Sequence, residues 1–165
     1  MYKQVKLLSD DDCKNLIDLF HERHDKTFRL DWESERGGRP TDRRQRLYLF
    51  ENSDIIYQSL REKILADYPD GYLIEIFIAK YEKGEGVDWH TDFEYYEKNP
   101  PLKNKRRYNF SILLTNDFEG GILEVDNESV DTPIGVATYF DTSFDHRVTR
   151  VTEGTRYSLI GWIYM

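Results

Sequence analysis

The stretch Tyr81-Glu82-Lys83-Gly84-Glu85-Gly86-Val87-Asp88-Trp89-His90-Thr91-Asp92 decides how the rest of the chain is interpreted. Its informative part is His90-x-Asp92, because side chains two residues apart in a strand point to the same face of a sheet. One imidazole and one carboxylate would therefore converge on one point. With a second imidazole, the set has the composition that binds iron(II) on one side and leaves other coordination positions open. An open site favours chemistry over a purely structural role.

Composition predicts one cytoplasmic domain spanning residues 1–165. That length suffices for one core but is short for two. The net charge of −8 disfavours nucleic acid as a partner. Cys13 is the only cysteine, which excludes an intrachain disulfide and suits a reducing compartment. The N-terminus lacks the apolar core of a signal peptide, and no apolar run approaches the roughly 18 residues of a membrane span.

Two helices are predicted in a helical N-terminal part, residues 1–70, and we expect them to pack on the outside of a sheet. The first starts at Ser9, which can cap it with Asp12 three residues later. Its apolar stripe has helical spacing and consists of Cys13, Leu16, Ile17 and Phe20. The second runs over 53–68, has Ile56, Leu60 and Ile64 on one side, and ends at Pro69.

Two features of this N-terminal part admit a functional and a plain interpretation. His21 and His24 could bind a metal, but we interpret them as solvated residues near a helix end. Residues 31–46 are predicted to be a loop because they contain Gly37-Gly38 and Pro40 and have no clear period. The five arginines of that loop are either a solvated surface or a basic rim for an acidic or phosphorylated substrate.

Strands dominate the sequence after a short one at 47–50 and form a predicted core over residues 71–165. We expect them at 73–80, 87–92, 108–115, 121–126, 135–140, 146–151 and 156–164, separated by glycine- and proline-containing turns. Many short strands with such turns indicate a sandwich, barrel or jelly roll.

The second imidazole and a cationic anchor are predicted in the last third of the chain. His146 is the only histidine after His90. Ten residues later, Arg156 shares a strand face with Ser158 and Trp162. A buried arginine needs an anionic partner, and a ligand carboxylate could be that partner. Arg147 and Arg150 are rival anchors, although Arg147 has the opposite strand parity to His146.

Together these residues resemble the iron(II)/2-oxoglutarate-dependent dioxygenases, and among them the prolyl-4-hydroxylase-like branch. The resemblance covers about residues 72–165 and rests on His90-x-Asp92, His146, Arg156 and Trp162 in this order. Tyr81 before a glycine-containing turn also resembles the family, as does the Gly120-Gly121 turn. One departure is that the strand reads Ile112-Leu113-Leu114, with leucines where several prolyl hydroxylases have a tyrosine.

The resemblance implies a fold, a site and a reaction. The fold would be a double-stranded β-helix, or jelly roll, with the two helices outside. His90, Asp92 and His146 would bind iron(II), and Arg156 would hold the far carboxylate of 2-oxoglutarate, assisted by Tyr81 and Ser158. Dioxygen would be the oxidant, ascorbate is a candidate stimulant, and a C–H bond would be hydroxylated while 2-oxoglutarate is converted to succinate.

Three functions remain open at this point. The first is hydroxylation of a prolyl or other residue in a protein or peptide, and the second is hydroxylation of a free amino acid or small metabolite. The third is a non-catalytic jelly-roll binding module. Residues 93–107 form a long segment without strand period, which we interpret as a lid over substrate. Tyr95, Tyr96 and Trp162 are the predicted substrate contacts.

Overall fold

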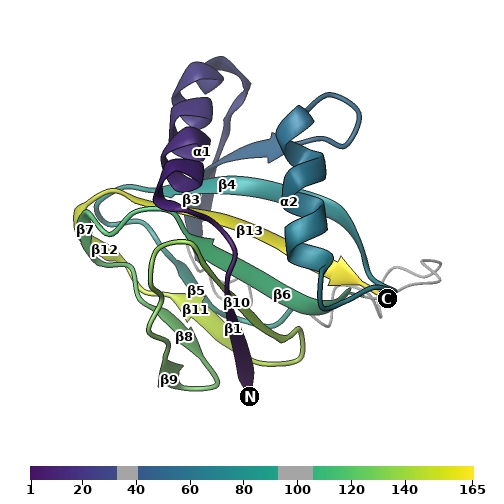
Figure 1. Cartoon of the computed structure of the whole chain (residues 1–165). Helices are drawn as coiled ribbons and strands as arrows, with labels where there is room; N and C mark the ends of the chain where they lie inside the picture. Colours follow the sequence, from purple (N-terminus) through teal and green to yellow (C-terminus); the bar gives the residue numbers. More distant parts are fainter. Residues whose placement is uncertain (33–40, 93–105) are drawn as a thin grey trace.

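The computed structural model describes residues 1–32, 41–92 and 106–165 (Figure 1). Its helices are α1 Asp10–Glu22, the short 3-10 helix η1 His24–Lys26, and α2 Ile55–Leu65. The strands before the second imidazole are β1 Tyr2–Lys6, β2 Phe28–Trp32, β3 Asp42–Leu49, β4 Tyr72–Tyr81, β5 Val87–His90, β6 Arg106–Leu113, β7 Phe118–Gly120, β8 Leu123–Val125, β9 Glu128–Ser129 and β10 Val136–Asp141. The last strands are β11 His146–Val148, β12 Val151–Gly154 and β13 Arg156–Tyr164.

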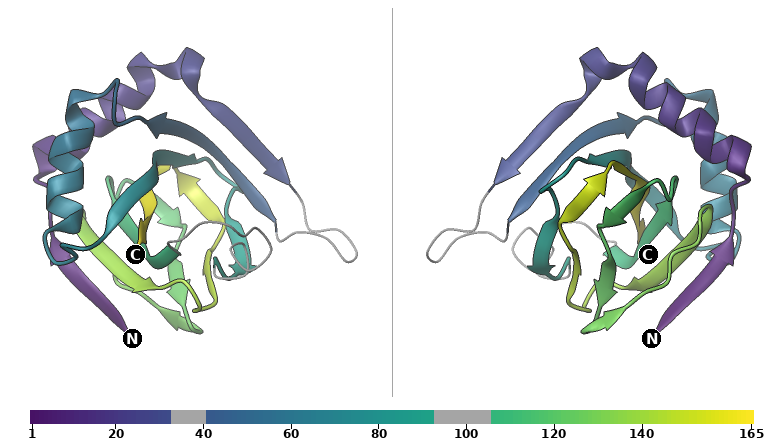
Figure 2. Two further views of the ribbon diagram at one scale, coloured as in Figure 1. Left: turned by 90° about the vertical axis from the view of Figure 1, so that its right-hand side faces the viewer. Right: turned by 90° about the vertical axis from the view of Figure 1, so that its left-hand side faces the viewer.

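One curled antiparallel sheet contains all these strands except β7 and β12, which pair with each other. Its strand order is β1-β10-β6-β13-β4-β3-β5-β11-β8-β9, and β2 adds to β3. Figures 1 and 2 show that the sheet curls around an interior and that both helices lie along its outer side. The long strand β3 pairs with β4 through residues 45–49 and with β5 at Asp42, so it joins the two halves of the sheet.

Strand periodicity divides the buried side chains into two cores. On β4, Ile76 and Ile78 belong to the core beneath the helices, whereas Phe77 and Tyr81 belong to the core inside the curl. Strand β13 repeats the pattern, with Leu159 on the helical side. Such strands are buried on both faces because the helices cover one face and the curled sheet covers the other. The inner core is the one that surrounds the candidate site.

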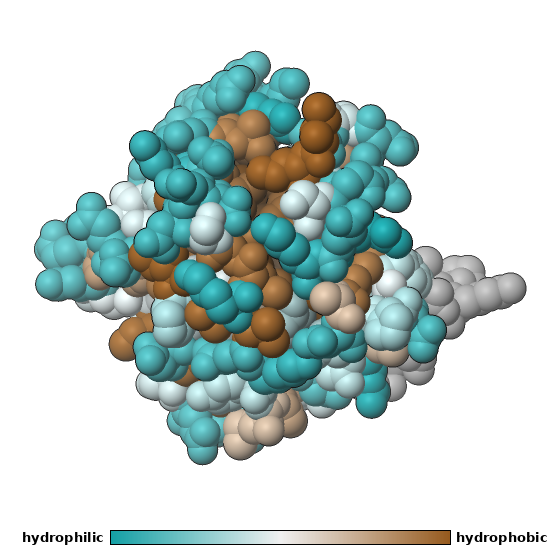
Figure 3. Space-filling view, viewed as in Figure 1, coloured by the Kyte–Doolittle hydropathy of each residue, from teal (hydrophilic) through white to brown (hydrophobic). Residues whose placement is uncertain are grey.

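The helix predictions agree with the structure in their main features. Ser9 caps α1, because its hydroxyl accepts from the amide of Asp12 (3.1 Å) and the Asp12 carboxylate accepts from the amide of Ser9 (2.9 Å). Helix α2 is shorter than predicted, since it ends at Leu65 and the chain then turns with Tyr68 N–H donating to the Leu65 carbonyl. In Figure 3, apolar side chains gather around and between the two helices.

The prediction of a loop over residues 31–46 is wrong at both ends, because residues 31 and 32 belong to β2 and residues 42–46 belong to β3. Alternation explains the strand: Leu47 and Leu49 are buried under the helices, while the side chains at 42, 44, 46 and 48 face the interior of the curl. The glycines and proline at 37–40, which motivated the loop, lie outside the described residues. The described residues of 1–70 thus contribute the strands β1, β2 and β3 as well as the two α-helices.

Several strand boundaries also differ from the prediction. The expected strand over 146–151 is divided into β11 and β12, which pair with different partners. Strand β5 ends at His90, two residues earlier than predicted. In the part of the chain that the structure describes, no helix is long and apolar enough to cross a membrane.

Candidate metal centre

Strands β5 and β11 bring the two imidazoles together. They pair antiparallel, and His90 and His146 are direct partners in the register. Their ring centroids are 4.2 Å apart. Asp92 follows two residues after β5, and its amide donates to the carbonyl of Thr142 over 3.1 Å. This backbone contact holds the carboxylate beside the imidazoles although the strand itself has ended.

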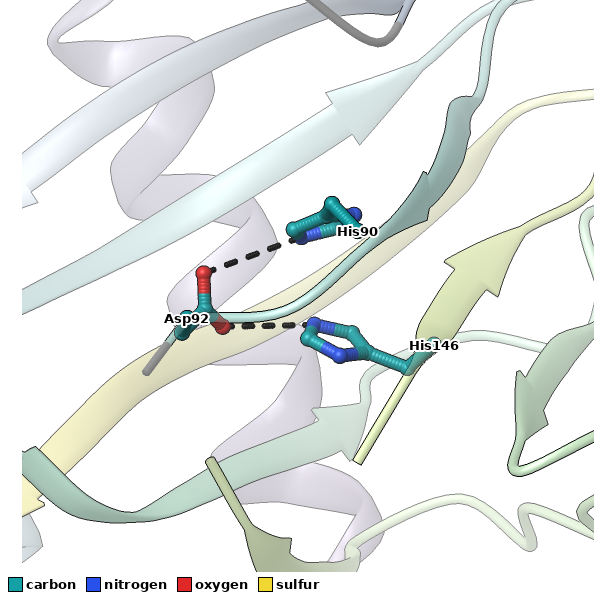
Figure 4. Close-up of side chains that lie close together, drawn as sticks. All are labelled: His90, Asp92 and His146. Atoms are coloured by element: carbon teal, nitrogen blue, oxygen red, sulfur yellow. Dashed lines mark ion pairs between the residues drawn. The ribbon is translucent and has the colours of Figure 1, made fainter. Parts of the chain in front are cut away.

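The three side chains point at one another (Figure 4). Nε2 of His146 lies 3.2 Å from Oδ2 of Asp92, and Nε2 of His90 lies 3.8 Å from Oδ1. All three ligand atoms fall within 4.8 Å of one another. Two imidazole nitrogens and one carboxylate oxygen at this spacing could bind one metal ion from one side. Within the described ranges, this is the one group of three or more metal-binding side chains so arranged.

Backbone carbonyls fix the orientation of both imidazoles. Nδ1 of His90 is 2.8 Å from the carbonyl of Asp88, and Nδ1 of His146 is 3.1 Å from the carbonyl of Phe144. A carbonyl can only accept, so each Nδ1 carries the proton and each Nε2 presents its lone pair to the shared point. Metal-binding histidines are commonly held in this way by a partner on the other ring nitrogen.

The electrostatic setting also suits a cation. Burial lowers the pKa of His90, and the neighbouring His146 lowers it further, which keeps the imidazole neutral. Burial alone would raise the pKa of Asp92, but the nearby imidazoles of His146 and His90 and the indole N–H of Trp162 outweigh it and hold that pKa well below its usual range. Neutral imidazoles and an ionised carboxylate are the protonation states that a metal requires.

Trp162 contacts the triad rather than standing apart from it. Its Nε1–H donates to Oδ2 of Asp92 over 3.1 Å, and its ring lies 3.7 Å from the guanidinium carbon of Arg106. The sequence predicted Trp162 as a substrate contact. The residue does line the cavity, and in addition it orients the carboxylate.

A cavity of about 450 Å³ opens over the triad, and its wall includes His90, Asp92 and His146. Much of the remaining wall comes from the inner faces of β3, β4, β6 and β13, with Tyr81 and Trp162 among the lining side chains, and β2, β5, β8, β10 and β11 add further side chains. A cavity of this size accommodates a small co-substrate together with part of a second molecule.

Arg156 is a buried cation next to this cavity. It is 1 % exposed; its Nε donates to the Gly121 carbonyl and its Nη1 to Oγ of Ser158, both over 2.9 Å. No described carboxylate pairs with it, and burial lowers its pKa. A buried guanidinium without an acidic partner fits a ligand that brings its own carboxylate. The guanidinium carbon also lies 5.1 Å from the centroid of the Tyr81 ring.

Tyr81 connects this cation to a second one, Arg44, which the sequence predicted as one of five arginines in a loop rather than on a strand that faces the cavity. Its hydroxyl accepts from Nη1 of Arg44 over 3.1 Å. Arg44 and Arg46 both line the cavity with Asp42 and Tyr48, all from one face of β3. The alternation of these four residues with Arg43, Gln45, Leu47 and Leu49 was the available signal, and the neighbouring glycines obscured it.

The other predicted residues are placed as follows. Arg147 pairs with Glu124 on the neighbouring strand, and Arg150 donates to the Gly84 carbonyl over 2.7 Å, so neither is a free anchor. His21 lies 3.2 Å from the Tyr157 hydroxyl, on the helical side of the sheet. Tyr95, Tyr96 and the lid predicted over 93–107 fall outside the described residues, except for 106 and 107, which belong to β6.

Comparison with known proteins identifies a family that matches this chain. Residues 76–164 match the family described as the 2OG-Fe(II) oxygenase superfamily. A PKHD-type hydroxylase of Synechococcus sp. (strain CC9605) is 32% identical over 96 residues, which are 53% of this chain and 40% of that protein. A PKHD-type hydroxylase of Psychrobacter sp. (strain PRwf-1) is 30% identical over 93 residues, 52% of this chain and 36% of that protein. The matches therefore span less than half the length of these relatives.

Two solved structures share the fold over nearly the whole chain. The viral collagen prolyl hydroxylase from Paramecium Bursaria Chlorella virus-1, in its 2OG complex, superposes with a TM-score of 0.73 at 16% identity, covering 99% of this chain and 95% of that one. The prolyl-4-hydroxylase of Pseudomonas putida gives a TM-score of 0.66 at 18% identity, covering 98% and 91%. At such identities the likeness establishes the fold alone.

Proposed function

The chain belongs to the 2OG-Fe(II) oxygenase superfamily, and we propose that it is an iron(II)- and 2-oxoglutarate-dependent hydroxylase of a prolyl or other residue in a protein or peptide. The observation that carries the proposal is the convergence of His90, Asp92 and His146 on one point in the wall of a cavity. The curled sheet supports the further proposal that the fold is a double-stranded β-helix with α1 and α2 outside, acting as one domain over residues 1–165.

Each residue of the site has a role in this proposal. His90, Asp92 and His146 bind iron(II) on one side, and the carbonyls of Asp88 and Phe144 keep both imidazoles in the required tautomer. Iron(II), with 2-oxoglutarate and dioxygen, would supply the oxidising power that no protein side chain offers. Trp162 holds the carboxylate of Asp92 in place through its indole N–H.

Arg156 anchors the co-substrate. Its position is fixed by Gly121 and Ser158, so its charge is available to the far carboxylate of 2-oxoglutarate. The Tyr81 ring lies beside the guanidinium and also lines the cavity, which suits a role for Tyr81 at the same co-substrate. The leucines at 113 and 114 are buried, and Tyr108, the tyrosine of β6, packs against Tyr68 in the core beneath the helices.

Release of succinate from 2-oxoglutarate tests the proposal. Iron(II), 2-oxoglutarate and oxygen are supplied with matched prolyl peptides or free amino acids, with and without ascorbate, and succinate and hydroxylated product are quantified. We expect turnover by the natural chain and none by Asp92→Ala. Turnover stimulated by free amino acids alone would favour the small-molecule hydroxylase. Metal binding without any succinate would favour the non-catalytic module.

A further inference from the structure

Two arginines of β3 share a single carboxylate inside the cavity. Arg44 approaches Asp42 with Nε 2.9 Å from Oδ1, and its Nη2 donates to Oδ2 over 3.1 Å. Arg46 reaches the same Oδ2 from its Nη2 over 3.3 Å. Two cations therefore face one anion, which leaves one positive charge without a counterion among the described residues.

That surplus charge is held away from bulk water. The side chains of Arg44 and Arg46 are 9 % and 14 % exposed. Their guanidinium carbons lie 5.4 Å and 4.5 Å from the centroid of the Phe77 ring. Burial lowers the pKa of Arg46, and Arg44 lowers it further. The Nε of Arg46 is buried and has no hydrogen-bond acceptor among the residues that the structure describes. A buried donor without a partner is costly, so a ligand that supplies an acceptor is favoured there.

The other cations lining the cavity already have acidic partners. Arg106 pairs with Glu75 over 3.2 Å, and Arg147 pairs with Glu124. The surplus in the described part of the cavity is therefore located on β3. Tyr48 and Tyr81 fix it there, because their hydroxyls accept from Arg46 and Arg44, each over 3.1 Å. The guanidinium groups are thus held in place before any ligand arrives.

Bound iron(II) and 2-oxoglutarate would not neutralise this surplus. One carboxylate of 2-oxoglutarate would be neutralised by Arg156. The other would be neutralised by the single positive charge that remains when iron(II) is bound by the Asp92 carboxylate. The surplus positive charge of Arg44 and Arg46 would remain, and both side chains lie in the wall of the same cavity as the triad. Resting on the proposed function, we infer that Arg44 and Arg46 bind a carboxylate of the primary substrate. A monoanion matches a surplus of one, whereas a phosphate dianion would exceed it.

Two sources of that carboxylate are distinguished by paired probes. The first pair is a prolyl hexapeptide with glutamate beside the proline and the same peptide with glutamine. The second pair is free L-proline and L-prolinamide. Each probe is titrated into the natural chain loaded with zinc(II), which has no redox chemistry, and 2-oxoglutarate. The side-chain Nε–Hε NMR signals of Arg44 and Arg46, assigned from the Lys variants, report binding directly.

We expect an acidic member of one pair to shift the Arg46 signal and to bind about ten- to hundred-fold more tightly than its neutral counterpart. Arg46→Gln should remove that preference. Arg46→Lys should retain part of it, because the charge remains while the planar fork is lost. Arg43→Gln is the matched control, since Arg43 lies on the opposite face of the same strand and pairs with Asp31 over 2.7 Å. Circular dichroism of each variant confirms folding.

Three results would overturn the inference: equal binding of both members in each pair, a preference that survives in Arg46→Gln, or no shift of the arginine signals by any acidic probe. The proposed function is judged separately, from succinate formed by the iron-loaded natural chain when the prolyl peptides and free amino acids are supplied. If that turnover is absent but the Arg46-dependent preference is present, the carboxylate site stands and the hydroxylase proposal fails. If Arg46→Gln instead raises the 2-oxoglutarate concentration needed for succinate formation without added substrate, Arg44 and Arg46 bind the co-substrate and the inference is wrong.

Discussion

The indole Nε1–H of Trp162 donates a hydrogen bond to Oδ2 of Asp92 over 3.1 Å. The last strand of the chain thereby orients a side chain that follows β5. The same Oδ2 faces Nε2 of His146 at 3.2 Å, so the indole restricts the carboxylate to the rotation that meets both imidazoles. Replacing a partner of this kind typically lowers metal affinity by about ten- to hundred-fold.

Trp162→Phe should therefore weaken metal binding by about ten-fold, since it removes the donor but keeps an aromatic ring for Arg106 to contact. Equilibrium dialysis of iron(II) under anaerobic conditions measures the change. Trp89→Phe is the control, because Trp89 precedes His90 on β5 and its ring lies 4.7 Å from the guanidinium carbon of Arg147. Equal losses in the two variants would argue against a specific role for the indole donor.

Removal of any one of His90, Asp92 and His146 should abolish iron(II) binding, because a site with three protein ligands has no substitute among the described side chains. The alanine variants are expected to stay folded and to form no succinate. His21→Ala should behave as the natural chain, since His21 contacts Tyr157 outside the triad. Metal analysis of the purified variants is the measurement, and full occupancy in Asp92→Ala would refute the assignment.

The residues of this site that could be predicted from the sequence are those placed by a pattern within a single strand. His90 and Asp92 were predictable because strand parity alone brings them to one face. His146 was predictable only as the remaining histidine. Its direct register with His90 depends on the pairing of β5 with β11, which no local pattern encodes. The indole of Trp162 meeting Asp92 likewise requires the curl of the sheet.

The cavity-facing side of β3 was not predicted, although its alternating pattern is local in the sequence. Asp42, Arg44 and Arg46 lie in a strand, yet glycine and proline a few residues earlier predicted a loop there. Charged residues also reduce apparent strand character, since an apolar pattern identifies only the helix-facing side of β3, at Leu47 and Leu49. The polar side of the same strand became visible only when the structure placed it in the cavity wall.

Cys13 predicts a pH dependence of stability. The thiol is 2 % exposed, and burial raises its pKa from 9.0 to about 11. The folded state therefore keeps the proton longer than the unfolded state, so this contribution is complete below pH 9 and is lost as the pH rises towards about 11. Urea unfolding should show a steeper loss of stability over this window in the natural chain than in Cys13→Ala. Parallel pH profiles would contradict the prediction.

We expect Arg156 to bind 2-oxoglutarate at the expense of the stability of the ligand-free protein. Its buried charge has no described acidic partner, so Arg156→Met should leave the free energy of unfolding of the ligand-free protein unchanged or raise it by up to about 2 kcal/mol. The natural chain with metal should gain about 2.7 kcal/mol at 2-oxoglutarate one hundred-fold above its Kd, and the Met variant should gain nothing. Arg147→Met, which loses the ion pair with Glu124 and the contact with the Trp89 ring, is the control. Denaturant unfolding with and without 2-oxoglutarate decides the point, and a Met variant that gains stability when 2-oxoglutarate is added would exclude Arg156 as the anchor.

Gly121 offers a steric test of the same anchor. Its φ is +56°, and an added Cβ would lie 2.9 Å from Cδ of Arg156 and 3.1 Å from Cγ2 of Val151. Gly84 has a φ of +85° with nothing within 4 Å of its added Cβ. Both alanine substitutions should lower the free energy of unfolding by about 1 kcal/mol, because both impose a side chain on a left-handed backbone.

The two glycine variants should differ in their response to 2-oxoglutarate. Gly121→Ala must displace the Arg156 side chain, which also donates to the Gly121 carbonyl, so its apparent KM for 2-oxoglutarate should rise by ten-fold or more. Gly84→Ala should leave that KM unchanged, since its cost is confined to the turn before β5. Steady-state succinate formation over a range of 2-oxoglutarate concentrations measures both. A normal KM in Gly121→Ala would mean that the position of Arg156 does not govern co-substrate binding. A raised KM in both variants would indicate a general loss of stability rather than displacement of Arg156.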